Sequence, residues 1–271
     1  MKVHLVQPIF APTKEQAERN IRSLQSLSDY VSAFPQEISL DFAGWGLPPY
    51  ISWIAARIHA SFAAYDVAVE VLDRNYGKAY VVNRMLSKER GNSKEFLLLC
   101  DSDIVFDRGC ENMLDRLLEI LEVTADGMGK PFGLIALNQL EGNCHLDEAR
   151  VNLYSFTNSY GNRERVYQPR SPSGIAGGCL FCSREAWQTV GGYREMGVYA
   201  GDDAFLLLDM AEKGFSYQLS EDVYVIHPPD QNREYGEWKK RVCLRDSDGA
   251  RKPSLSAQID EAESFWKSSV T

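Results

Sequence analysis

The stretch that decides the fold is Phe96-Leu97-Leu98-Leu99-Cys100-Asp101-Ser102-Asp103, in which an apolar run leads directly into two carboxylates. A short run that is apolar throughout is typical of a strand buried on both faces, as in a parallel sheet. Ligands of open α/β sheets bind beyond the carboxyl ends of such strands. The stretch therefore predicts a central strand over residues 95–100 with a binding site at its end.

Asp101 and Asp103 are candidate ligands of a divalent cation. Side chains two residues apart on an extended chain project to the same side, so both carboxylates can converge on one point. Converging carboxylates repel each other unless a cation joins them, and oxygen ligands suit Mn²⁺ or Mg²⁺. The alternative is a solvated loop whose aspartates cap a helix near Asp107. The position directly after an apolar strand favours the metal site.

Segments of strand and helix character alternate on both sides of this stretch. Strands are expected at residues 3–10, 37–42, 67–72, 132–137 and 223–226, and helices at residues 14–34, 51–64, 78–90 and 107–123. The glycines and prolines of residues 44–49 predict a turn, and residues 138–172 predict loops or an irregular hairpin. The alternation predicts an α/β fold in which a mixed, mostly parallel central sheet is flanked by helices.

The length and composition fit one large domain. The 271 residues are 44% hydrophobic, which is enough for a sizeable core. We expect a single domain over residues 1–245 and a tail over residues 246–271 that contains a helix near 259–266.

The charge and hydropathy patterns disfavour some classes of partner. A formal net charge of -9 disfavours sequence-independent binding to nucleic acid or to an anionic membrane. No run approaches the roughly 18 apolar residues of a membrane span, and the first residues lack the pattern of a signal peptide. We therefore expect a soluble, cytoplasmic protein.

A second group of residues with functional character follows residue 174. Gly177 and Gly178 form a pair that allows close approach of the backbone to a ligand. Asp202 and Asp203 stand where a helix is expected to begin, so they can cap that helix or act as a base. His227 ends an apolar run; such a histidine is usually structural, but beside an acidic metal site it is a candidate third ligand.

The order of these segments resembles that of the GT-A-fold glycosyltransferases, over residues 3–227. The resemblance is to the large inverting family 2 and to the galactosyltransferase-like C-terminal region. Residues 75–83, NYGKAYVVN, resemble the N-x-G-K-A…N segment that lines the donor site, and Asp101-Ser102-Asp103 matches the DxD motif. Residues 177–193 resemble the acceptor-side GG…GGY block, and Gly201-Asp202-Asp203 resembles the G-E-D motif.

The resemblance implies a GT-A, Rossmann-like fold with a donor-binding half to about residue 137 and an acceptor-side half over residues 138–245. It implies a metal-dependent, inverting transfer from a nucleoside-diphosphate sugar, expected to be a UDP-sugar, to a hydroxyl acceptor. Asp203, beside Asp202, is then the catalytic base. The metal ligands implied are Asp101, Asp103 and His227. The donor-binding residues implied are Asp41, Arg74, Asn75, Gly77, Lys78, Asn83, Asp101, Ser102 and Asp103, and the acceptor-binding residues are Gly177, Gly178, Trp187 and Asp202.

Some positions depart from the family pattern. Asp202 stands in place of Glu, and Phe205 and Asp209 stand where many relatives carry Asp and Arg. Two other functions stay open: a nucleotidyltransferase, and a catalytically degenerate domain that binds a sugar nucleotide. A saccharide or glycan is the favoured acceptor. Modified DNA is the alternative, which basic side chains near Arg163, Arg165 and Arg233 would have to contact.

Overall fold

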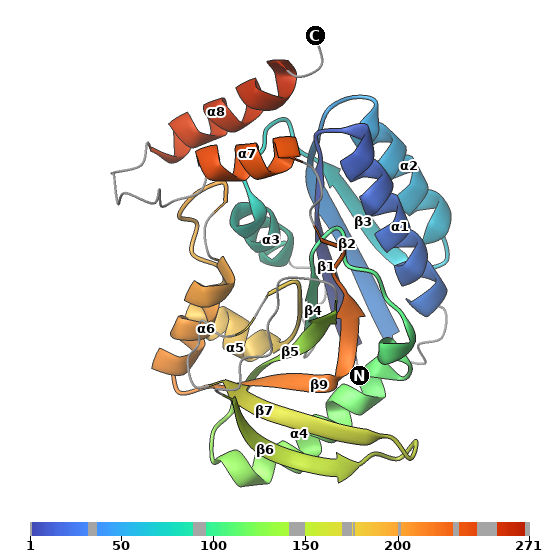
Figure 1. The fold of residues 1–271 in the computed structure, drawn as a ribbon, viewed down its shortest axis with the longest axis vertical. Helices are drawn as coiled ribbons and strands as arrows, with labels where there is room; N and C mark the ends of the chain where they lie inside the picture. Colours follow the sequence, from blue (N-terminus) through green and yellow to red (C-terminus); the bar gives the residue numbers. More distant parts are fainter. Residues whose placement is uncertain are drawn as a thin grey trace.

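The computed structural model describes residues 2–31, 37–88, 96–140, 150–169, 175, 177–199, 202–229, 233–242 and 254–268 (Figure 1). The strands are β1 (Lys2–Ala11), β2 (Glu37–Gly46), β3 (Asp66–Val71), β4 (Phe96–Cys100), β5 (Phe132–Leu140), β6 (Arg150–Thr157), β7 (Arg163–Pro169), β8 (Cys179–Ser183) and β9 (Ser216–Ile226). The helices are α1 (Lys14–Val31), α2 (Tyr50–Ser61), α3 (Lys78–Ser87), the short 3-10 helix η1 (Arg108–Cys110), α4 (Met113–Met128), α5 (Arg184–Val190), α6 (Asp202–Glu212), α7 (Arg233–Val242) and α8 (Leu255–Ser268).

All the strands join in one mixed sheet in the order β3-β2-β1-β4-β8-β5-β9-β7-β6. Neighbouring strands from β3 to β4 pair in parallel, as do β5 and β9, whereas β8 runs antiparallel to β4 and β5. The β6–β7 hairpin extends the sheet antiparallel to β9. This architecture confirms the predicted α/β class with a mixed central sheet. The strand predicted at the acidic stretch is β4, which lies inside the sheet.

Helices cover both faces of the sheet and bury two hydrophobic clusters. One cluster includes Leu24 of α1, Ile54 of α2 and Leu117 of α4, which are all fully buried. The other joins α3, α5 and α6 to the opposite face through residues such as Val82 and Leu206. Figure 1 shows α1 and α2 on one side of the parallel strands and α3, α5 and α6 on the other. The carboxyl ends of β1 and β4 stay open between these layers.

The turn predicted at residues 44–49 is wrong in its first half, because β2 continues to Gly46. Gly44 pairs with Ile9 of β1, and a Cβ atom on Gly44 would lie 1.9 Å from the Ile9 carbonyl oxygen. The glycines therefore allow β1 and β2 to approach closely, and they do not end β2. As a result Asp41 lies in the middle of β2, opposite Val6, and not at the end of the strand.

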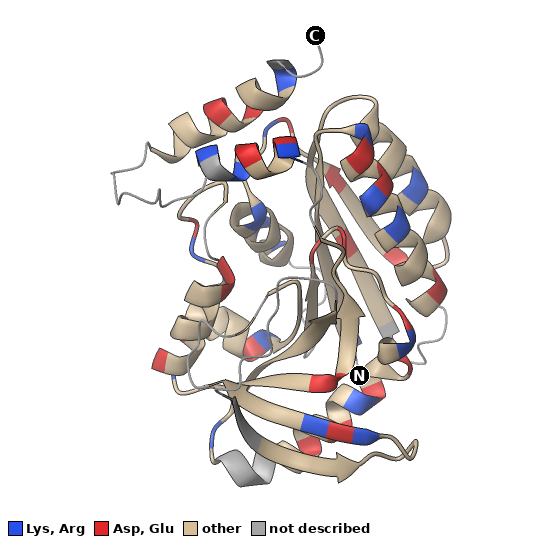
Figure 2. Cartoon of the chain, viewed as in Figure 1, with Lys and Arg blue, Asp and Glu red and all other residues tan. Residues whose placement is uncertain are grey.

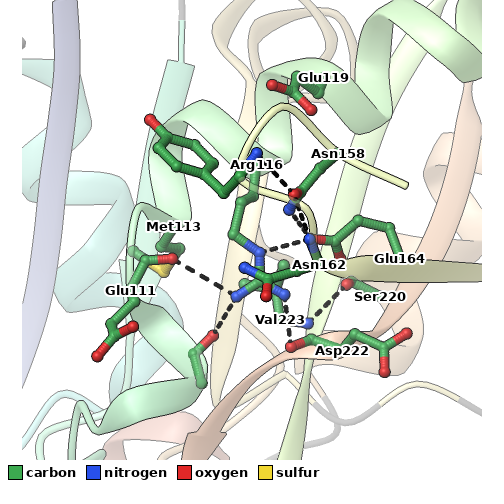
Figure 3. A network of polar contacts seen from close by, with 12 residues as sticks. Glu111, Met113, Arg116, Glu119, Asn158, Asn162, Glu164, Ser220, Asp222 and Val223 are labelled. Carbon is green, nitrogen blue, oxygen red and sulfur yellow. Dashed lines mark hydrogen bonds and ion pairs between the residues drawn. The ribbon is translucent and has the colours of Figure 1, made fainter. Parts of the chain in front are cut away.

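A buried polar network joins the β6–β7 hairpin to the rest of the sheet (Figure 3). Arg116 of α4 pairs with Glu164 of β7, whose side chain is fully buried. The same guanidinium donates to the carbonyl oxygens of Gly109, at 3.0 Å, and Asp222, at 2.8 Å. Asn158 in the hairpin turn adds a second donor to Glu164 at 2.7 Å. One arginine thus holds η1, α4, β7 and β9 together.

The two C-terminal helices pack on each other above the carboxyl edge of the sheet (Figure 1). The helix expected near residues 259–266 is present as α8. Its Trp266 is fully buried in a cluster with Trp45 of β2 and Trp238 of α7. Arg74 pairs with Asp260 and with Glu263 of the same helix. Aromatic packing and these ion pairs therefore fix α8, and through it α7, against the domain.

Candidate active site

An open pocket of about 870 Å³ lies at the carboxyl ends of β1 and β4. Its polar lining includes six residues that the sequence singled out: Asn75, Lys78, Asp101, Ser102, Asp103 and His227. Gly77 also lines it. The pocket lies where open α/β sheets bind ligands, and it brings these predicted site residues together.

Lys78 joins the acidic tip of β4 to the start of α6. Its Nζ lies 2.8 Å from Asp101 Oδ1 and 3.1 Å from Asp203 Oδ1. Burial alone would lower the pKa of Lys78, but the carboxylates of Asp101 and Asp203 raise that pKa well above its usual value. The amine is therefore a fixed positive charge in the pocket. Two aspartates that are 102 positions apart in the sequence meet on one ammonium group.

The backbone before Lys78 requires glycine. Gly77 has a φ of 85°, and a Cβ atom there would lie 2.5 Å from the Val198 carbonyl oxygen. Its N–H donates to Asn75 Oδ1 at 3.2 Å. Asn75 is 5% exposed, and its Nδ2 has no hydrogen-bond partner within the described ranges. A buried donor of this kind at a pocket wall is suited to an acceptor atom of a ligand.

Asp103 has two basic neighbours. Its Oδ2 accepts a hydrogen bond of 2.7 Å from Arg19 Nη2, and its Oδ1 lies 3.5 Å from His227 Nε2. Burial would raise the pKa of Asp103, but His227 and Arg19 together lower it to about 2. Asp103 is thus ionised at every pH at which the protein would work. Backbone hydrogen bonds between Val105 and Ile226, in both directions, hold the ends of β4 and β9 next to each other.

The glycine pair and the two aspartates of α6 meet beside Lys78. The Gly177 N–H donates to Asp203 Oδ2 at 3.2 Å, and a Cβ atom on Gly177 would lie 1.9 Å from Asp203 Cγ. The Gly178 carbonyl oxygen accepts from the Asp101 N–H at 2.8 Å. Burial raises the pKa of Asp202 to about 7, so this carboxyl group carries a proton for part of the neutral pH range.

Four predicted site residues, Gly177, Gly178, Asp202 and Asp203, are not in the pocket lining but lie beside Lys78 and Asp101, which line it. Four others, Asp41, Arg74, Asn83 and Trp187, are held in contacts away from the lining. Asp41 lies 3.2 Å from His4 Nε2 inside the sheet. Arg74 is engaged by α8. Asn83 bonds the backbone of Tyr193 in both directions, at 2.8 and 3.0 Å, and Trp187 packs edge-on against the Tyr193 ring. These contacts give the last four residues structural roles in this arrangement.

An aromatic wall faces the polar side of the pocket. It consists of Phe10, Trp45, Tyr199, Tyr235 and Trp238. Trp238 stacks on Phe10 with ring centroids 4.9 Å apart and on Tyr235 at 5.4 Å. It is 3% exposed, and its Nε1 has no hydrogen-bond partner among the described residues.

Sequence reasoning missed that Trp45 and Trp238 form one wall. The available signal was the spacing of Tyr235, Trp238 and Val242, which places three apolar side chains on one face of a helix.

The positions of the candidate metal-ligating side chains can be compared with the geometry that a divalent cation needs. No group of three or more His, Cys, Asp or Glu side chains within the described ranges is arranged to hold a metal ion. Adjacent donors of an octahedral ion with bonds of ~2.1 Å lie about 3 Å apart, close to the 3.5 Å between Asp103 Oδ1 and His227 Nε2. Such ions commonly take few protein ligands and complete their shell with substrate phosphates and water. Asp103 and His227 fit this pattern, whereas Asp101 faces Lys78.

Comparison with known proteins supports the fold assignment. No protein-family model matches the sequence, and no curated protein matches it. Among solved structures, residues 1–349 of S. aureus TarS match with a TM-score of 0.58 and 14% identity, over 84% of this chain and 60% of that one. The mannosyltransferase PcManGT from Pyrobaculum calidifontis, in complex with GDP-Man and Mn²⁺, matches with a TM-score of 0.58 and 15% identity, over 97% of this chain and 69% of that one.

GalNAc-T7, with UDP, GalNAc and Mn²⁺, matches with a TM-score of 0.59 and 10% identity. The match covers 99% of this chain but 50% of GalNAc-T7. These likenesses show that the chain has the fold of the GT-A glycosyltransferases, as its motifs predicted. No helix within the described ranges is long and apolar enough to cross a bilayer.

Proposed function

We propose that the protein is a glycosyltransferase that moves a sugar from a nucleoside-diphosphate sugar to a hydroxyl acceptor with inversion. The observation that carries the proposal is the position of Lys78 between Asp101 and Asp203, at 2.8 and 3.1 Å. This arrangement puts a cation, suited to a diphosphate, directly beside a carboxylate suited to accept a proton. The GT-A fold supports the same function.

The pocket has the two kinds of surface that such a donor needs. Lys78 and the buried amide of Asn75 would bind phosphate oxygens at the polar side. The aromatic wall would stack on a flat nucleobase or on a sugar face, and the Trp238 N–H offers a donor to its edge. The expected donor is a UDP-sugar.

Asp203 is the proposed catalytic base. It would take the proton from the acceptor hydroxyl, whose oxygen forms a bond to the anomeric carbon from the side opposite the diphosphate. The bond from that carbon to the phosphate oxygen breaks, and the nucleoside diphosphate leaves with the electron pair. The hydrogen bond from Gly177 N and the contact with Lys78 hold both oxygens of Asp203 in place for this step.

The proposal includes a divalent cation, Mn²⁺ or Mg²⁺. Asp103 and His227 are the residues that would hold it. Such a cation supplies positive charge that stabilises the leaving diphosphate. The separation of 3.5 Å between Asp103 Oδ1 and His227 Nε2 supports this role. In this arrangement Asp101 acts on the donor through Lys78.

A saccharide is favoured over DNA as the acceptor, because two of the basic side chains that DNA would have to contact already pair with carboxylates. Arg165 pairs with Asp222 and Glu221, and Arg233 pairs with Glu237. Figure 2 shows acidic and basic segments interspersed on α1, α7 and α8. Binding to a phosphate backbone would need free cations on one surface.

A product assay tests the proposal and separates it from the alternatives. Purified protein is incubated with Mn²⁺, a panel of UDP- and GDP-sugars and a mixture of saccharide acceptors, and the release of nucleoside diphosphate is measured. A parallel incubation contains nucleoside triphosphates and sugar 1-phosphates, and the release of pyrophosphate is measured. Glycosyl transfer predicts release of nucleoside diphosphate, and Asp203→Asn should reduce this release at least a hundredfold while donor affinity changes little. Glu212→Gln, at an exposed position on the same helix, is the matched control.

Release of pyrophosphate from the nucleoside triphosphate and sugar 1-phosphate mixture would identify a nucleotidyltransferase instead. Donor binding without turnover of any donor in the panel would favour a degenerate binding domain.

A further inference from the structure

The N-terminal half of α1 buries a polar face that the proposed reaction has not yet used. Gln16, Arg19, Asn20 and Ser23 recur at helical spacing, and each is buried. Asn20 donates to the Phe10 carbonyl oxygen at 2.9 Å, and Ser23 accepts from Gln7 at 3.1 Å. Buried polar residues at consecutive helical positions need partners, and these lie in the segments that surround the pocket.

Arg19 makes the most extensive contacts of this face. It is 7% exposed. Its Nη2 donates to Asp103 Oδ2 at 2.7 Å and to the Pro228 carbonyl oxygen at 2.7 Å, and its Nη1 donates to the Pro229 carbonyl oxygen at 2.9 Å. Asp103 follows β4, whereas Pro228 and Pro229 directly follow His227 at the end of β9. One buried guanidinium thus joins the two segments that carry the proposed metal ligands.

These contacts fix which atoms the two ligands present. Because Arg19 holds Asp103 Oδ2, the other oxygen of the same carboxylate is the one that faces His227, at 3.5 Å. The bonds to the two proline carbonyls hold the backbone that follows the histidine. The backbone bridge between Val105 and Ile226 aligns the strand ends, but it leaves the Asp103 side chain free to rotate. Hydrogen bonds of this kind orient ligating side chains and tune the affinity for the metal.

We infer that Arg19 is a positioning residue that sets Asp103 Oδ1 and His227 Nε2 at the separation of adjacent ligands of one divalent cation. The inference rests on the proposed function, because it assumes the cation site. It does not make Arg19 a ligand of the ion. An effect of the Arg19 charge alone would be the opposite, because a positive guanidinium beside the carboxylate repels a second cation and so weakens metal binding. We expect the gain in metal affinity from the fixed ligand positions to exceed the loss from this repulsion.

The test is the affinity for Mn²⁺, measured by electron paramagnetic resonance with and without UDP. Four proteins are compared: the wild type, Arg19→Met, Arg19→Lys and Arg22→Met, the last an exposed position on the same helix. Arg19→Met and Arg19→Lys should both weaken Mn²⁺ binding by about 10- to 100-fold. Lysine keeps the charge but cannot reach all the acceptors with one planar group. Arg22→Met should bind like the wild type.

A second readout separates positioning from general damage to the fold. In the transfer assay the KM for Mn²⁺ should rise in both Arg19 variants, while kcat at saturating Mn²⁺ stays within about threefold of the wild type. Circular dichroism must show that both variants are folded at the assay temperature. If Arg19→Met is unfolded, the Mn²⁺ affinity of Arg19→Lys alone tests the inference.

Wild-type affinity in Arg19→Lys, or tighter binding in Arg19→Met, would overturn the inference and leave the proposed function intact. A wild-type protein that binds no Mn²⁺ even with UDP would overturn the cation site and the inference together.

Discussion

Replacement of Glu164 by Gln should destabilise the protein through the buried network around Arg116. The substitution keeps size and shape but removes the negative charge that pairs with the Arg116 guanidinium. Loss of one partner of a buried ion pair costs about 3–5 kcal/mol. Arg116 keeps its bonds to the carbonyl oxygens of Gly109 and Asp222, so the lower end of that range is expected. For a chain of this size, roughly 3 kcal/mol corresponds to a decrease in Tm of about 6–12 °C.

The assay is thermal unfolding followed by circular dichroism, with urea unfolding as a second measure of the free energy. Glu111→Gln is the matched control, because only its backbone oxygen faces Arg116 and its side chain is exposed. Affinity for UDP should stay unchanged in both variants, since the network lies outside the pocket lining. A Tm for Glu164→Gln within about 2 °C of the control would refute the reasoning that the pair holds the hairpin.

Three further predictions concern the pocket. Trp238→Leu should weaken UDP binding at least tenfold by calorimetry, because it removes a stacking surface and a hydrogen-bond donor. The control is Trp53→Leu on α2, where the side chain is 44% exposed, and it should leave UDP binding unchanged. Equal effects of the two substitutions would count against the aromatic wall. Burial raises the pKa of Asp202 to about 7, so the folded state holds this proton more tightly than the unfolded state. The stability that the protonated carboxyl group contributes is fully present below about pH 4 and is lost as the pH rises through 7. Asp202→Asn should therefore gain stability relative to the wild type between pH 4 and 7.5 in urea unfolding, by up to roughly 4 kcal/mol, and parallel curves would contradict this. Lys78→Met should weaken UDP binding more than tenfold, because a charge-assisted contact to the diphosphate is lost, and unchanged affinity would remove Lys78 from the donor site.

The sequence predicted the parts of the site that follow from local pattern. An apolar run that ends in Asp101 and Asp103 favoured a buried strand with an acidic tip, and β4 is that strand. The helix predicted over residues 78–90 is α3, which begins at Lys78 and ends at Ser87. These features depend on residues that are neighbours in the chain, so periodicity and residue type were sufficient.

Other parts depend on contacts between distant segments, which a pattern does not encode. Arg19 lies on a helix that the sequence predicted from the spacing of its apolar residues. The hydrogen-bond partners of Arg19 lie 84 to 210 positions away in the sequence. Arg74 stands next to the donor-site motif, but α8 engages it. Gly44 resembled a turn residue because glycine is common in turns, yet here it serves close approach of two strands. In each case the tertiary partner decides the role of the residue.

The same limit explains the position of Asp41. The family pattern places an acidic residue after the second strand, and the turn expected at residues 44–49 would have put Asp41 near that point. Because β2 continues to Gly46, Asp41 stays inside the sheet beside His4. Its neighbours at the actual end of the strand, Trp45 and Gly46, are aromatic or without a side chain. A nucleobase at this edge would therefore meet an aromatic ring and not a carboxylate.

A crystal structure of the protein with Mn²⁺ and UDP tests the central claim most directly. The account predicts the diphosphate within hydrogen-bond distance of Lys78 Nζ, and one Mn²⁺ bound by Asp103 Oδ1, His227 Nε2 and phosphate oxygens. Asp203 should border the space where the sugar would extend. A nucleotide bound elsewhere, or an ion that contacts neither Asp103 nor His227, would contradict the account.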